Sequence, residues 1–456
     1  MSEQIPSAEE LAKIPLSEDL SALERETGAA AGLQALRGHY VAQPAPGWDV
    51  HGLWHTFGAT SRSGYATHAL ALHWMLEKEL RIPIQLIPHR AQSIDVDRLP
   101  KDRFELLFEW TKNAVGHPEM LFASFPVDLA AEMDGTYPGD ETHGRVVPYT
   151  AFEATRISDY TKALSCGPIF PEIWTVSEFA RRSFVDSGVP AEKVRTVRPM
   201  LWGGPWEVPK VRRRSSDNFV FGMLGSWQKR KGMHDLIRAY WSSFKRSDRV
   251  ILSIRTSPFG ADGALTLREF VEKIIKKELA PIAREFGDDD YPNGGRLAKI
   301  SLDAGTGLTD AQVIEWIDGL DGFANPSYGE GLGIPHVWAK CFGIPMASTA
   351  FGAVGEMLQE FGGDGDEMVP HRLARVDQEM ARHNIMFDVT RSEWGVYDYL
   401  DLGAAMRRIY ERGRIRSAAQ QETYRKAFGV ETVEGLRTAL RGVLPAEWAD
   451  KWLSTS

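Results

Sequence analysis

Residues 219–256, FVFGMLGSWQKRKGMHDLIRAYWSSFKRSDRVILSIRT, contain a short apolar run, a basic Gly-containing loop, an amphipathic stretch and a second apolar run. Short apolar runs bounded by turn residues predict buried strands, and the amphipathic stretch 231–244 predicts a helix between them. Two strands joined through a helix usually lie parallel in one sheet. This segment therefore predicts a βαβ unit and places the chain in the α/β class.

The same alternation continues on both sides of this segment. Upstream, further strands are predicted at 51–57, 82–89, 120–126, 145–153 and 172–177, and a helix at 177–189 with Ser177 as N-cap and Gly188 as its stop. Downstream, strands are predicted at 322–328 and 344–349, and helices at 267–286, 334–343 and 402–428.

A stretch rich in Pro, Gly and charged residues, 199–218, interrupts the alternation. A chain of 456 residues has room for two large domains. We therefore expect an α/β protein with two Rossmann-like domains that face each other across a cleft. The predicted extents are an N-terminal extension at 1–50, domains at 51–205 and 206–428, and a C-terminal helical segment at 429–456.

Composition excludes several classes of protein. Two cysteines, Cys166 and Cys341, cannot make a disulfide framework or a zinc site of cysteines alone. The formal charge of -9 gives no overall indication of a nucleic-acid partner. Residues 1–15, MSEQIPSAEELAKIP, lack the basic start and apolar stretch of a signal peptide, and no apolar run is long enough to span a bilayer. We expect a cytoplasmic protein.

The loop at 225–232 is the first candidate site. Arg230 and Lys231 stand between Gly225, at the end of a predicted strand, and Gly232, at the start of a predicted helix. Backbone N–H groups and the helix dipole attract anions at such a position, so two cations there would hold a diphosphate. A solvated basic turn is the alternative interpretation.

The second candidate site lies within 325–349, NPSYGEGLGIPHVWAKCFGIPMAST. Gly331 and Gly333 allow a ligand to approach the backbone closely, and Pro335 suits the first turn of a helix whose N-terminus would face an anion. Glu330 precedes these residues, and its carboxylate could accept hydrogen bonds from sugar hydroxyls. A tight turn with an exposed Glu is the alternative.

This second stretch resembles the signature of the large family-four retaining glycosyltransferases, E-G-F-G-L-P-x-L-E-A followed by a G-x-P strand. The matching residues are Glu330, Gly331, Leu332, Gly333, Ile334, Pro335, Ala339, Gly343, Ile344, Pro345 and Ser348. The loop Arg230–Lys231–Gly232 resembles the phosphate loop of the same family. The resemblance extends roughly from His51 to Phe428, and it implies the two-domain GT-B fold.

Two positions depart from the family pattern. The family usually carries a second Glu eight positions after the first, and that Glu typically binds the ribose of the donor. Here the position is Trp338, whose indole can only donate a hydrogen bond. Ser226 stands where a G-R-L version of the phosphate loop has Arg, so Arg230 would supply the charge instead.

Further candidates come from the same resemblance. The acceptor side would include the Gly-rich loop at 58–65 together with Glu153; its residues are Gly58, Ser61, Arg62, Ser63, Gly64, Tyr65 and Glu153. The donor side would be formed by Gly225, Ser226, Arg255, Thr256, Gly331, Leu332, Gly333, Ile334, Pro335 and Trp338. His143 is interpreted as a surface histidine.

The resemblance implies a retaining hexosyl- or pentosyltransferase that moves a sugar from a nucleotide-sugar donor to a hydroxyl acceptor, which we expect to be a saccharide or a small molecule. Glu330, Lys231 and Arg230 would be its catalytic residues. The nucleotide sugar is a substrate, and we expect no cofactor and no metal. The acidic stretch 284–297 is interpreted as an exposed insertion and not as a metal motif.

Other functions remain open on the sequence. A basic run, Lys210, Arg212, Arg213 and Arg214, could border a groove for a phosphate backbone, which would make a hydroxymethylated DNA base the acceptor. A solvated linker explains the same run. Nucleotide-sugar epimerases share the two-domain architecture, and a binding protein without catalysis is a further alternative.

Overall fold

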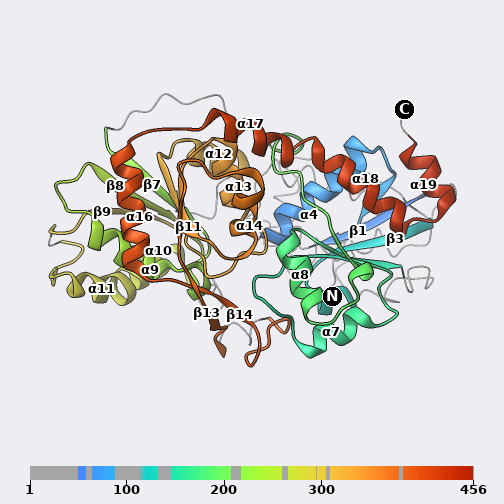
Figure 1. Cartoon of the computed structure of the whole chain (residues 1–456), viewed down its shortest axis with the longest axis horizontal. Coiled ribbons are helices and arrows are strands. Elements are labelled where there is room, and N and C mark those ends of the chain that lie inside the picture. Colours follow the sequence, from blue (N-terminus) through green and yellow to red (C-terminus); the bar gives the residue numbers. More distant parts are fainter. Residues whose placement is uncertain are drawn as a thin grey trace, which may run out of the picture.

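The protein consists of two α/β domains that lie side by side (Figure 1). The computed structural model describes residues 50–57, 64–87, 115, 117–131, 145–206, 217–258, 265–293, 295–304, 309–378 and 384–454. The predicted extension at 1–50 falls outside these residues except for Val50. Two parallel sheets with flanking helices confirm the predicted fold class.

The N-terminal domain is built on a six-stranded parallel sheet in the order β2-β1-β3-β4-β5-β6. Its strands are β1 His51–Phe57, β2 Ile84–Leu86, β3 His117–Ser124, β4 Val146–Thr150, β5 Ile173–Thr175 and β6 Val194–Thr196. Its helices are α4 Gly64–Trp74, continued by a π-helical turn at Met75–Glu79, α6 Val127–Ala131, α7 Asp159–Cys166 and α8 Glu178–Asp186.

Helix α8 begins and ends where the sequence predicts. The Ser177 hydroxyl accepts the backbone N–H of Ala180, which satisfies one of the unpaired donors of the first turn. Gly188 follows the helix with φ of 98°, a conformation that other residues adopt only at a cost.

The C-terminal domain has a second six-stranded parallel sheet, in the order β12-β11-β10-β7-β8-β9. Its strands are β7 Phe219–Leu224, β8 Val250–Arg255, β9 Lys299–Asp303, β10 Gly322–Ala324, β11 Met346–Thr349 and β12 Glu367–Val369. Its helices are α9 Met233–Ser243, α10 Leu267–Lys273, α11 Ala280–Glu285, α12 Asp310–Asp318, α13 Ile334–Cys341 and α14 Gly352–Phe361. Strands β7 and β8 are parallel neighbours, and α9 connects them along the chain, so the predicted βαβ unit is confirmed.

The last helices return from the C-terminal domain to the N-terminal domain (Figure 1). They are α16 Tyr399–Arg412, α17 Ala418–Ala427, α18 Glu431–Val443 and α19 Ala446–Leu453. Helix α16 packs on α9, whereas Thr432 on α18 contacts Met75 and Trp448 on α19 stacks on His51 at 4.5 Å.

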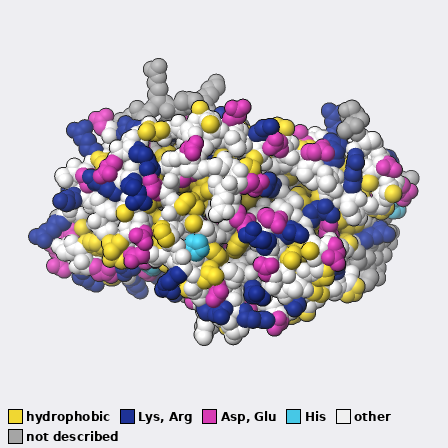
Figure 2. All heavy atoms as spheres, viewed as in Figure 1, with side chains coloured by type: hydrophobic (Ala, Val, Ile, Leu, Met, Phe, Trp, Pro, Cys, Tyr) yellow, Lys and Arg dark blue, Asp and Glu magenta, His cyan; other side chains and the backbone are white. Residues whose placement is uncertain are grey.

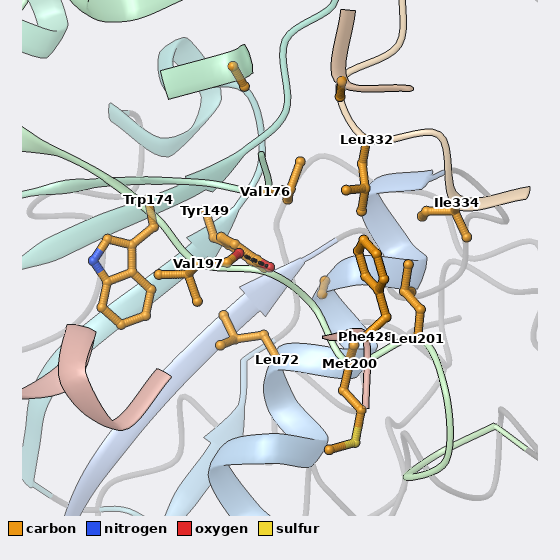
Figure 3. Close-up of a cluster of buried hydrophobic side chains, with 14 of the residues drawn as sticks. Leu72, Tyr149, Trp174, Val176, Val197, Met200, Leu201, Leu332, Ile334 and Phe428 are labelled. Atoms are coloured by element: carbon orange, nitrogen blue, oxygen red, sulfur yellow. Dashed lines mark hydrogen bonds between the residues drawn. The ribbon is translucent and has the colours of Figure 1, made fainter. Parts of the chain in front are cut away.

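One hydrophobic core runs across the boundary between the domains (Figure 3). Leu332 and Ile334, from the loop before α13, point toward Leu201 and Phe428 (Figure 3). The same cluster continues into the N-terminal sheet, where the Tyr149 hydroxyl donates to the Val197 carbonyl at 2.9 Å. The two domains therefore share part of their hydrophobic core.

A two-stranded antiparallel sheet, β13 Arg372–Arg375 and β14 Glu393–Val396, adds a second connection between the domains. The chain before β14 forms an antiparallel bridge from Phe387 to Ile157. The backbone N–H of Ser158 donates to the Met386 carbonyl at 2.8 Å. Both contacts join the C-terminal domain to the loop after β4.

The acidic stretch 284–297 is only partly the exposed insertion that the sequence predicts. Asp288 is buried and accepts the backbone N–H of Arg296 at 3.2 Å. Tyr291 packs edge-on against Trp241 of α9. A carboxylate that caps its own loop is a local structural contact, and charge patterning alone does not reveal it.

A buried ion pair joins α13, the turn before β12 and α17. The Lys340 ammonium lies 2.7 Å from Asp366, and neither side chain is more than 1% exposed. Gln420 on α17 accepts a hydrogen bond from the same ammonium, and the Met346 N–H donates to Asp366 at 2.7 Å.

Removing one partner of this pair should be costly because the other charge stays buried. We expect Asp366→Ala to lower the free energy of unfolding by about 3–5 kcal/mol in urea denaturation. Glu272→Ala is the control, since Glu272 forms solvent-exposed pairs with Arg268 and Lys276 and should change stability little. Equal stability of the two variants would contradict a structural role for the pair.

Candidate functional site

Two loops at the carboxyl ends of C-terminal strands carry the candidate residues. After β7 the chain turns at Gly225 and Ser226, makes a 3₁₀ turn at Lys229–Lys231 and enters α9 through Gly232, whose φ is 66°. After β10 the chain reaches Gly333, with φ of 79°, and then enters α13. Both helices therefore start at the edge of the sheet where ligands bind in open α/β folds.

The two loops bring Arg230, Lys231 and Glu330 together. The Lys231 ammonium donates to Glu330 Oε1 at 2.5 Å, and Arg230 Nη1 lies 3.5 Å from Glu330 Oε2. The Ser327 hydroxyl donates to the same carboxylate at 2.5 Å. The three predicted catalytic residues thus form one buried group, although Glu330 is 99 positions from Lys231 along the chain.

Glu153 of the N-terminal domain completes this group. Its Oε1 lies 3.6 Å from Arg230 Nη2, so Arg230 is placed between two carboxylates. The exposed side-chain fractions are 9% for Arg230, 13% for Lys231, 10% for Glu330 and 17% for Glu153. We call these four residues the interdomain cluster.

Charge and burial set the protonation of the cluster. Burial raises the pKa of Glu330, but Lys231 and Arg230 oppose this effect and bring the pKa down to about 2. Burial lowers the pKa of Lys231, which Glu330 partly offsets. Glu330 is therefore ionised at neutral pH and acts only as a hydrogen-bond acceptor.

The two domains are in direct backbone contact beside this cluster. A Cβ atom on Gly329 would overlap the Glu153 carbonyl oxygen, and one on Gly331 would lie 2.9 Å from the Ala151 side chain. The Ser177 hydroxyl donates to the Gly331 carbonyl at 2.5 Å. Any side chain at 329 would force the loops apart.

Four of the other predicted donor residues lie at or beside the cluster. The Lys231 side chain packs over Gly225, so closely that a Cβ on Gly225 would be 3.3 Å from it. Leu332 and Ile334 are buried in the shared core (Figure 3). Pro335 occupies the first turn of α13. These residues support the loops that carry the charged groups.

Three predicted donor residues make contacts of a different kind. Arg255 pairs with Asp303 at 3.2 Å and lies over the Trp316 ring. Thr256 is buried after β8, and the Ser226 hydroxyl accepts a hydrogen bond from Gln228 at 2.6 Å. Arg255 is therefore engaged by its own domain and does not join the interdomain cluster.

Trp338 is engaged by the segment that links the domains. Its indole N–H donates to the Leu201 carbonyl at 2.9 Å, and its ring packs edge-on against Trp206. With 4% of the residue exposed, Trp338 is a packing residue in this structure. Its hydrogen-bonding group is already used.

The acceptor-side candidates are only partly described. Gly64 lies beside Ile334, and the Tyr65 hydroxyl donates to the Ala151 carbonyl at 2.8 Å. Both therefore lie against the same interdomain contact. Gly58, Ser61, Arg62 and Ser63 fall outside the described residues, as do His143 and the basic run Lys210–Arg214.

Three residues of the site were not predicted from the sequence. Ser327 binds Glu330, Ser177 binds Gly331, and His336 lies in the first turn of α13. The His336 Nε2 atom is 2.9 Å from the Asn325 carbonyl, and burial lowers the pKa of this histidine, so it is neutral at pH 7. The sequence signal that could have identified Ser327 is its position three residues before Glu330.

The described residues contain no group of three or more His, Cys, Asp or Glu side chains arranged to hold a metal ion. In the same part of the chain, no helix combines the length and apolar character needed to cross a bilayer.

Solved structures with the same two-domain architecture are similar to this chain. Sucrose-phosphate synthase from Thermosynechococcus elongatus matches with a TM-score of 0.54 at 13% identity, over 86% of this chain and 97% of that one. Anabaena HepE, in complex with UDP and glucose, matches with a TM-score of 0.52 at 12% identity, over 87% and 100%. The fold is GT-B.

A third GT-B structure, the lipopolysaccharide outer core galactosyltransferase WaaB in its apo form, matches with a TM-score of 0.51 at 13% identity, over 87% of this chain and 100% of that one. No protein-family model matches the chain, and no curated protein matches its sequence. Identities this low establish the GT-B fold, and the functional inference depends on the residues of the site.

The glycine contact can be tested by adding one methyl group. We expect Gly329→Ala to lower stability by about 1–3 kcal/mol, the usual cost of overpacking, because its Cβ would meet backbone of the other domain. Gly435→Ala within α18 is the control, since its Cβ would meet nothing within 4 Å and alanine favours a helix. A melting temperature for Gly329→Ala equal to that of wild type would contradict the contact.

Proposed function

We propose that this protein is a glycosyltransferase that moves a sugar from a nucleotide-sugar donor to a hydroxyl acceptor. The observation that carries the proposal is the interdomain cluster, in which Arg230 and Lys231 lie beside Glu330 at the start of two helices. Its place in a GT-B fold supports the same function, because HepE, with that fold, was solved with UDP and glucose.

The two cations would bind the diphosphate of the donor. Lys231 and Arg230 are neutralised by Glu330 and Glu153, and a diphosphate would bring more negative charge than either carboxylate. The N-termini of α9 and α13 add backbone N–H groups and the positive ends of their dipoles. These groups would stabilise the charge that develops on the leaving diphosphate.

Glu330 would then orient the donor sugar. Its lowered pKa keeps it ionised, and its carboxylate can accept hydrogen bonds from sugar hydroxyls once Lys231 turns toward the diphosphate. The interdomain contact at Gly329 and Gly331 would exclude water and protect the donor from hydrolysis. We propose that the anomeric configuration is retained, as the family resemblance implies, and that the transfer is independent of metal ions.

Trp338 bears on how the nucleotide is held. Its indole N–H is bonded to Leu201, and it has no acceptor for ribose hydroxyls. We infer that the ribose is bound by other groups of the C-terminal domain. A uridine diphosphate sugar is the first donor to test, since HepE binds UDP.

A saccharide or small molecule is the acceptor that we propose. The DNA alternative rests on a basic run that lies outside the described residues. On the face shown in Figure 2, basic and acidic side chains are interspersed. Within the part of the chain that the structure describes, no observation favours DNA over a saccharide.

The proposal is tested by measuring nucleotide release from UDP-, GDP- and ADP-sugars, each alone, with mixed saccharides and with hydroxymethylated DNA. We expect one donor to release its nucleotide faster with saccharides, also in the presence of EDTA. Faster release with hydroxymethylated DNA, and not with saccharides, would identify DNA as the acceptor. A changed sugar without any acceptor would identify an epimerase, and binding without release would identify a protein without catalysis.

Lys231→Ala should lower the turnover number by about 100- to 1,000-fold, the usual effect of removing one group that stabilises developing charge. Arg230 remains 3.5 Å from Glu330, so the carboxylate keeps a partner and the variant should fold. Lys229→Ala is the matched control, because this neighbouring lysine is 62% exposed and pairs with Asp377. Unchanged turnover in Lys231→Ala would contradict the assignment.

A further inference from the structure

A cavity of about 490 Å³ lies in the C-terminal domain, between the start of α9, the β13–β14 sheet and the start of α16. Its lining includes Asp235, His371, Arg372, Tyr397, Asp398 and Tyr399. None of these residues belongs to the interdomain cluster. Pockets for small molecules commonly have volumes of about 300–1,000 Å³, so the cavity is large enough for a sugar.

The charges of the lining do not favour an anionic ligand. The lining carries two carboxylates, Asp235 and Asp398, and one guanidinium, that of Arg372, while Arg238 lies 3.7 Å from Asp235. Burial lowers the pKa of His371, so the imidazole adds no positive charge at neutral pH. The lining therefore offers a phosphate group no excess of positive charge, whereas a neutral ligand needs none.

The carboxylates are held in place by the surrounding fold. The Tyr328 hydroxyl donates to Asp235 Oδ2 at 2.5 Å, and the backbone N–H of Leu400 donates to Asp398 Oδ1 at 2.8 Å, where Asp398 caps α16. Carboxylates fixed in this way present their remaining acceptor positions to a ligand that carries hydroxyl donors.

Aromatic side chains give the cavity apolar surfaces in addition to its carboxylates. Tyr397, Tyr399 and His371 line the same cavity, together with Pro370. Aromatic rings offer broad apolar faces, against which the C–H groups of a pyranose ring can pack while its hydroxyls reach polar groups. Fixed carboxylates beside aromatic rings therefore suit a neutral, polyhydroxylated ring.

The cavity adjoins the loop that carries Arg230 and Lys231. The Tyr397 hydroxyl is 3.5 Å from the Gly232 carbonyl, and a Cβ on Gly232 would overlap that hydroxyl. The Tyr328 N–H donates to the Arg230 carbonyl at 2.8 Å. The cavity and the interdomain cluster thus adjoin the same loop.

We propose that this cavity is a second saccharide-binding site, which takes a neutral mono- or oligosaccharide and is separate from the interdomain site. Binding at this site is independent of the proposed transfer reaction, so it can be tested without any measurement of turnover.

The test is saturation-transfer NMR with the full chain and neutral probes: glucose, galactose, N-acetylglucosamine and their disaccharides. We expect one of these sugars to bind in the presence of saturating UDP and also to the Lys231→Ala variant. Tyr399→Ala should weaken that binding about tenfold, which corresponds to about 1.4 kcal/mol. Asp398→Asn should weaken it as well, while asparagine preserves the helix cap.

Leu400→Ala is the matched control, because Leu400 follows Tyr399 but is 54% exposed and does not line the cavity. It should bind the sugar as wild type does. Binding that UDP or Lys231→Ala abolishes, and that Tyr399→Ala and Asp398→Asn leave unchanged, would overturn the proposal and place the sugar in the interdomain site. Absence of binding by every neutral probe would also overturn it. Absence of turnover with binding intact would contradict the proposed function alone.

Discussion

The structure depends on the contact of two backbones from different domains. The loop 329–331 lies against residues 151–153, and the distance is so short that only glycine fits at 329. Van der Waals repulsion between backbone atoms is steep, so this contact defines how near the two sheets come. The position of Glu153 beside Arg230, and of Ser177 beside Gly331, follows from it.

The electrostatics of the site follow from the same contact. Two cations and two carboxylates are placed together where little water reaches them. Burial of such charges is tolerated because each has a partner of opposite sign. Under the proposed function, a diphosphate would replace Glu330 as the partner of Lys231, and the freed carboxylate would accept hydrogen bonds from the donor sugar.

Much of the fold could be predicted because local patterns encode it. The βαβ unit at 219–256, the N-cap at Ser177 and the helix after Gly333 all arise from residues close in sequence. The grouping of Arg230, Lys231 and Glu330 was also predictable, because both loops follow parallel strands and those strands end at the same edge of the sheet.

Contacts between distant segments could not be predicted in this way. The bond from Trp338 to Leu201, the burial of Asp288 and the bridge from Phe387 to Ile157 depend on how whole elements pack. Periodicity describes which face of an element is apolar, and it does not name the partner of that face. The cavity beside Gly232 has the same origin, because segments that are distant in sequence line it.

The most direct test of the central claim is a crystal structure of the protein with a bound nucleoside diphosphate. We expect diphosphate oxygens within hydrogen-bond distance of Lys231 and Arg230, and we expect that Glu330 no longer pairs with Lys231. A nucleotide bound elsewhere, with the Lys231–Glu330 pair still at 2.5 Å, would contradict diphosphate binding by the interdomain cluster.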